Sequence, residues 1–160
     1  MRAKMKTRPG ILIDEKDRWI YQQAELIQPD ILAYFRQNLH RSDRTYFIRN
    51  TFGELVEEGE LDAVLGFPLH AISAVPQTED VHFLVDSGER ITIPFSAIYL
   101  DRDDCFFFEM PGRGVPVRLT ASAMTHVSDT LVDTSPPRWS AGVPVSRKSL
   151  SEYFINPPAR

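Results

Sequence analysis

The side chains of this sequence that could do chemistry are carboxylates, four histidines and one thiol, and none has the spacing of a known catalytic motif. Glycine-rich phosphate loops, the GxSxG nucleophile elbow and the HExxH zinc motif are all absent. A single cysteine, Cys105, excludes both a CxxC zinc site and an internal disulfide. The sequence therefore offers no catalytic residue and no cofactor, and it favours a protein that is not an enzyme.

An acidic turn is the weak candidate for a metal site. Asp101, Asp103 and Asp104 place three carboxylates close together, and hard cations prefer oxygen ligands. The glycine and the distant glutamate of a calcium loop are missing at the required offsets. We interpret this segment as a solvated turn, with a metal site or a small enzyme using one of the histidines as the alternative.

A basic cluster follows the first predicted helix and is the candidate binding site. Guanidinium groups and a histidine gathered in this way could hold an anionic ligand or an acidic partner surface. Cations at a helix end also interact favourably with the helix dipole, which gives a purely structural alternative. The cluster consists of Arg36, His40, Arg41, Arg44 and Arg49.

Charge is distributed unevenly along the chain, although the net charge is only −4. Residues 54–109 carry a net charge of −11, whereas the segments on either side carry +4 and +3. Such an acidic middle argues against binding to duplex nucleic acid. It either solvates a surface or meets the basic ends of a second copy.

Apolar runs in the sequence are short. The basic start of the chain is followed by an apolar run that ends at Asp14, too early for a secretory signal, and no run of 18 apolar residues is present. We therefore expect a cytoplasmic protein that does not enter a membrane.

The first half of the chain predicts a hairpin, a helix and further strands. Residues 11–14 and 19–22 form the hairpin, and Pro29 opens a helix over 29–41 with the apolar stripe Ile31, Leu32, Phe35 and Leu39. Residues 45–49 have the composition of a strand. Residues 54–66 fit either a helix or a strand, and their alternation favours a strand.

The second half predicts strands followed by one helix. A hairpin joins 81–85 to 90–94 around Asp86-Ser87-Gly88-Glu89. Residues 105–110, with three consecutive phenylalanines, indicate a strand buried on both faces. Thr120 caps a helix over 121–132. Other strands are expected at 69–75, 97–100 and 115–119.

Residues 134–160 form a proline-rich tail with apolar side chains. Monomers seldom expose large apolar patches, so the tail should dock through Trp139, Tyr153 and Phe154. We expect docking on a neighbouring subunit rather than on residues 1–133.

The order of these elements resembles a bacterial family known as domain of unknown function 1285. The hairpin of 11–14 and 19–22, the helix with Ile31, Phe35 and Leu39, and the strand at 46–48 carry the resemblance, which extends over residues 11–132. The sequence departs from the family in the acidic residues 54–62 and after residue 133. The resemblance implies the order of elements and transfers no catalytic or binding residue.

These patterns predict an α+β fold with mostly antiparallel sheet, two helices packed on it and an extended C-terminal tail. Residues 1–10 should be a loose basic arm, and residues 11–133 a single domain, or alternatively two small halves, 11–76 and 77–133. The favoured function is a non-catalytic binding or assembly domain that self-associates and binds a protein partner or a small anion. The alternative is a small enzyme or metal-binding protein with an unrecognised pocket.

Overall fold

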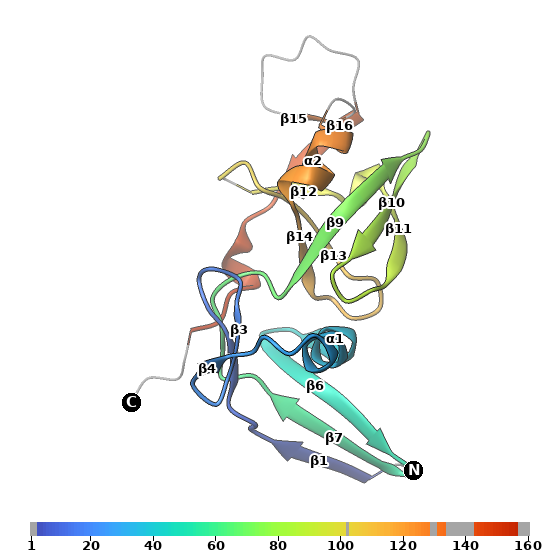
Figure 1. The fold of residues 1–160 in the computed structure, drawn as a ribbon. Helices are drawn as coiled ribbons and strands as arrows, with labels where there is room; N and C mark the ends of the chain where they lie inside the picture. The colour runs from blue at the N-terminus through green and yellow to red at the C-terminus, as the bar shows by residue number, and fades with distance from the viewer. Residues whose placement is uncertain (1–2, 102, 129–130, 134–142, 157–160) are drawn as a thin grey trace. The chain divides into compact units, whose positions relative to one another are not determined.

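The computed structural model describes residues 3–101, 103–128, 131–133 and 143–156. The chain forms two compact units, both visible in Figure 1. The first consists of Met1–Pro68, Met110–Val115 and Ser151–Arg160, and the second of Leu69–Glu109 and Pro116–Leu150. Each unit contains segments from distant parts of the chain.

A four-stranded sheet forms one part of the first unit. Its order is β1-β7-β6-β5, with bounds Ala3–Thr7, Leu55–Glu60, Thr45–Phe52 and Leu39–Ser42. Strands β5, β6 and β7 pair antiparallel as successive hairpins. The strand expected at 45–49 is confirmed, as is the strand interpretation of residues 54–66.

The N-terminal segment is a strand and not a loose arm. Strand β1 pairs parallel with β7, from Ala3 opposite Leu55 to Thr7 opposite Gly59. Lys4, Lys6 and Arg8 recur at every second position, which is the period of a strand. An interpretation based on charge alone misses this alternation.

Helix α1 (Pro29–Asn38) begins with a proline at its first turn, as predicted. It ends earlier than residue 41 because Leu39 is fully buried at the start of β5. The Phe35 ring packs against Trp19, with 6.0 Å between ring centroids. Ile31, expected in the buried stripe, is 43% exposed.

A second small sheet of the first unit contains the predicted hairpin. Its order is β4-β3-β2-β8, with bounds Ala24–Glu25, Trp19–Tyr21, Ile11–Ile13 and Ala63–Val64. Strands β2 and β3 pair antiparallel, and β8 pairs parallel with β2. Asp14 closes the hairpin, because its Oδ1 accepts the backbone N–H groups of Lys16 and Arg18 at 3.0 and 2.9 Å.

The second unit contains an eight-stranded sheet among the described residues. Its order is β11-β10-β9-β14-β13-β12-β16-β15. The bounds are Arg90–Pro94, Asp80–Val85, Leu69–Pro76, Pro116–Leu119, Phe106–Glu109, Tyr99–Leu100, Val143–Arg147 and Leu131–Asp133. The hairpin of β10 and β11 is confirmed, while the strand expected at 97–100 is shortened by the 3₁₀ turn Phe95–Ala97.

Helix α2 (Ala121–Val127) packs against β9 in the second unit. The Thr120 hydroxyl accepts the N–H of Ala123 at 3.3 Å, so the predicted cap is present. The helix ends before residue 132, and Leu131 belongs to β15. Ala123 and Val127 supply its buried face.

The fold is broadly α+β, but the expectation of mostly antiparallel sheet is wrong. All three sheets are mixed, with parallel pairs β1–β7, β2–β8, β9–β14, β12–β16 and β15–β16. All of these pairs except β15–β16 join strands that are far apart in the sequence. Side-chain alternation identifies a strand but carries no information on the direction of its neighbour.

Phenylalanines form much of the core of the second unit. Phe107 and Phe108 are adjacent on β13 and fully buried, so this strand is buried on both faces as predicted. Phe83 stacks on Phe108 with 4.8 Å between centroids. Cys105, just before β13, is a buried thiol that is not part of a disulfide. Within the described ranges, no helix is long and apolar enough to cross a membrane.

Candidate functional site

A cleft of about 730 Å³ lies on one face of the β1-β7-β6-β5 sheet. All of its lining belongs to the first unit. The lining residues are Lys4, Lys6, Thr7, Arg8, Ser42, Asp43, Thr45, Phe47, Arg49, Glu58 and Glu60. We refer to this surface as the sheet cleft.

Strand register places the charged side chains of the sheet cleft on a common face. Glu58 of β7, the strand between β1 and β6, is paired on both sides. It lies opposite Arg49 of β6 and opposite Lys6 of β1. Glu60 is opposite Phe47. Directly paired residues point to the same side of a sheet, so Arg49, Glu58 and Lys6 form one transverse row of alternating charge, and Glu60 lies on the same face.

Two of the four cations in the sheet cleft are neutralised by acids. Arg8 lies 2.6 Å from Glu60, and Arg49 lies 3.2 Å from Glu58. Lys4 and Lys6 are exposed and form no ion pair or hydrogen bond with the residues that the structure describes. These two ammonium groups are the cationic groups of the cleft that an incoming anion can use.

Phe47 supplies an aromatic surface within the cleft. The Arg49 guanidinium lies over its ring at 5.3 Å from the centroid. The His40 ring stacks on the same phenylalanine, at 5.6 Å and an interplanar angle of 10°. Burial lowers the pKa of His40, and the positive charges of Arg49 and Arg113 lower it further. His40 is therefore neutral near pH 7.

The predicted basic cluster is divided by the strands that carry it. His40 and Arg49 lie on the Phe47 side of the sheet, where Arg49 lines the sheet cleft and His40 lies beside it. Arg41 is one residue further along β5, so it points to the opposite side, where it lies over the Tyr153 ring at 4.7 Å. Arg44 donates to the Ser151 carbonyl at 3.4 Å. The cluster is thus not one site, and its role in anion binding remains a prediction for His40 and Arg49.

The end of α1 is capped by an arginine that the sequence did not single out. Arg113 donates to the carbonyls of Gln37 at 2.6 Å and Arg36 at 2.8 Å. The last carbonyls of a helix have no partner within it, so a cation placed there satisfies them and the helix dipole together. Arg36, a member of the predicted cluster, therefore takes part through its backbone carbonyl.

The C-terminal segment docks within its own unit. Tyr153 is fully buried in the single chain, and its carbonyl accepts the Tyr46 hydroxyl at 2.8 Å. Phe154 packs edge-on to Phe67 at 5.6 Å. The expectation that a neighbouring subunit covers Tyr153 is therefore wrong, because these intrachain contacts bury it completely. Trp139 lies outside the described residues.

The acidic turn serves the local backbone. Asp101 is buried, and its Oδ1 accepts the N–H groups of Asp103 and Cys105, both at 2.9 Å. Asp104 lies 3.4 Å from the guanidinium of Arg147. Within the described part of the chain, no group of three histidine, cysteine or acidic side chains is arranged to hold a metal.

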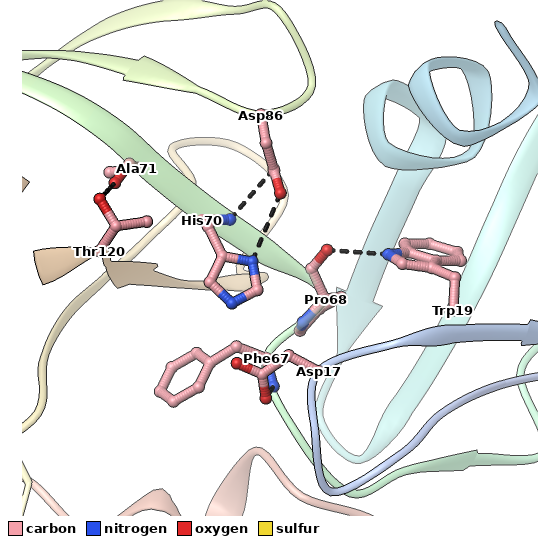
Figure 2. A network of polar contacts seen from close by, with 8 residues as sticks. All are labelled: Asp17, Trp19, Phe67, Pro68, His70, Ala71, Asp86 and Thr120. Atoms are coloured by element: carbon pink, nitrogen blue, oxygen red, sulfur yellow. Dashed lines mark hydrogen bonds and ion pairs between the residues drawn. The ribbon is translucent and has the colours of Figure 1, made fainter. Parts of the chain in front are cut away.

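Figure 2 shows further polar contacts of both units, among them those of His70 and Trp19. In the second unit, Asp86 accepts the His70 backbone N–H at 3.0 Å and lies 3.4 Å from its Nδ1. The backbone N–H of Asp86 in turn donates to the His70 carbonyl at 2.8 Å, so this pair joins the two strands at the end of the β9–β10 hairpin away from its turn. In the first unit, the Trp19 indole donates to the Pro68 carbonyl at 2.9 Å.

Solved structures with a similar fold are DUF1285 family proteins. One, from Silicibacter pomeroyi, is 13% identical with a TM-score of 0.60, and the match covers 81% of this chain and 73% of that chain. Another, from Shewanella baltica, is 17% identical with a TM-score of 0.54, covering 76% and 91%. No protein-family model and no curated protein matches the sequence. The resemblance seen in the sequence is therefore supported as a distant likeness of fold, and it brings no activity or ligand with it.

Proposed function

We propose that this protein is a non-catalytic binding domain that holds an anionic group of a partner in the sheet cleft. The observation that carries the proposal is the pair Lys4 and Lys6, two exposed ammonium groups on the cleft face without an acidic partner among the described residues. The neighbouring cations are already paired with Glu58 and Glu60. An anion entering the cleft would supply the charges that the two lysines lack.

The chemistry of the cleft supports binding rather than catalysis. Its hydroxyl groups come from Ser42, Thr45 and Thr7, and Thr7 donates to Glu57 at 3.4 Å. A hydroxyl nucleophile requires a general base within hydrogen-bond reach, and in the described structure neither the Ser42 nor the Thr45 hydroxyl forms a hydrogen bond to one. The side chains of the cleft are instead suited to electrostatic recognition.

Calorimetric titration with hexaglutamate at low ionic strength tests the proposal. The Lys4→Gln/Lys6→Gln double variant should bind about two- to thirtyfold more weakly, because each of the two exposed ion pairs contributes about 0.2–1 kcal/mol. Lys16→Gln is the matched control, since Lys16 is also exposed in the same unit but lies outside the cleft. Equal loss in the control and the double variant, or no binding by the wild type, would refute the proposal.

Self-association, a cytoplasmic location and a protein partner remain proposals. Light scattering of the free protein measures the first directly. A mass of one chain, unchanged with concentration, would contradict self-association while leaving anion binding in the sheet cleft intact.

A further inference from the structure

We infer that the partner is an extended acidic peptide segment that adds to the sheet as a new strand along the outer edge of β1. This inference rests on the proposed function and assigns its sheet cleft a partner class and a geometry. Strand β1 is the terminal strand of its sheet, pairing with β7 on one side. No other described strand pairs with its outer side, so its alternate backbone N–H and C=O groups are available there.

The side chains of β1 define the pattern that a partner must match. Lys4 and Lys6 are exposed on the cleft face, and Arg8 continues the same row at the next alternate position. A strand laid beside β1 presents its own alternate residues to that face, directly opposite these cations. Acidic residues at every second position would therefore meet Lys4 and Lys6 in turn.

The chain itself contains a strand with this chemistry. Strand β7 carries Glu58 and Glu60 at alternate positions on the cleft face, where they pair with Arg49 and Arg8. Across the sheet the charge runs from positive at Arg49 to negative at Glu58 and positive at Lys6. An acidic residue on the next strand continues this alternation. The partner that fits is therefore a segment resembling β7 in its acidic alternation.

A second copy of β1 does not fit the same edge. When two strands pair antiparallel about a twofold axis, residues on the same face must be opposite one another. Every such register of β1 with itself places lysine or arginine opposite Lys4 and Lys6. Like charges directly opposite are destabilising, so this edge discriminates against its own copy in favour of an acidic strand.

Fluorescence anisotropy with labelled peptides tests the inference on the full chain. The probe alternates glutamate with valine over seven residues, and a second peptide has the same composition with its glutamates contiguous. A third peptide has the sequence of the probe, but the backbone nitrogens that would point toward β1, at every second residue, are methylated. The probe should bind, and methylation should weaken it by at least about tenfold, since three or four backbone hydrogen bonds are lost together.

Charge reversal gives the complementary measurement. Lys4→Glu/Lys6→Glu should lose the acidic probe and gain a peptide that alternates lysine with valine, while Lys16→Glu should change neither. All three acidic peptides could bind equally well, with binding that still depends on Lys4 and Lys6. That result would overturn strand addition and leave the proposed function standing. If no acidic peptide binds and Lys4→Thr/Lys6→Thr instead self-associates, the lysines only protect the edge, and both ideas fail.

Discussion

Replacing Tyr46 with phenylalanine removes one hydroxyl that holds the C-terminal segment in the first unit. That hydroxyl donates to the Tyr153 carbonyl at 2.8 Å inside the core, where both tyrosines are at most 1% exposed. Tyr46→Phe keeps the ring and removes one hydrogen bond of a buried carbonyl, which costs about 1–3 kcal/mol. We therefore expect the free energy of unfolding to fall by about that amount in urea titrations.

Hydrogen exchange locates the effect within the molecule. Val64 and Ile155 exchange backbone hydrogen bonds of 2.8 and 2.6 Å just beyond Tyr153. Their amides should exchange about tenfold faster for each 1.4 kcal/mol lost, if the segment opens as a local unit. Tyr21→Phe is the control, because no hydrogen bond from the half-buried Tyr21 hydroxyl is seen in the described structure. Equal stability of wild type and Tyr46→Phe, with unchanged exchange at Ile155, would refute the account of the docked segment.

Three other changes have defined outcomes. Burial and nearby arginines lower the pKa of His40 in the folded state, so the unfolded chain binds more protons below pH about 6.5. Stability should therefore fall as the pH drops through that range. His40→Gln should flatten this part of the stability–pH curve measured by urea titration, and an unchanged slope would contradict the role assigned to His40. Arg113→Met should cost about 0.5–2 kcal/mol in the same titration because it uncaps the last carbonyls of α1, and no loss would show that water replaces the guanidinium without cost. Gly66→Ala should reduce the yield of folded protein severely, since the added Cβ would lie 2.4 Å from the backbone oxygen of Asp14; normal thermal stability of this variant would show that the hairpin can shift.

Turn residues, prolines and capping residues in the sequence predict the hairpins and helix ends that depend on a few neighbouring residues. The hairpin of 81–85 and 90–94, the proline that opens α1 and the Thr120 cap are all present. The parallel pairs could not be predicted in this way. Strand β9, for example, pairs with β14, whose Val117 is opposite Leu69. Only the packing of the whole chain brings such distant segments together.

The residues of the sheet cleft were not identified as a site from the sequence, because they come from separate strands that the fold brings together. A cluster defined by closeness in sequence joined Arg41 to His40 and Arg49, although successive residues of a strand point to opposite faces. The cations that do line the sheet cleft, Lys4 and Lys6, recur with a period of two, and this pattern is readable in the sequence. Their acidic neighbours on β7 follow only from the register of the parallel pair.

Chemical-shift mapping of the labelled protein during titration with the alternating acidic peptide is the most direct test of the sheet cleft as the binding site. We predict that the amides of β1, together with those of Thr45, Phe47 and Glu58, shift progressively and saturate with one peptide bound. Amides of the second unit, including those of β10 and β11, should remain unchanged. Saturable shifts confined to the second unit, or shifts scattered over both units without saturation, would contradict the account.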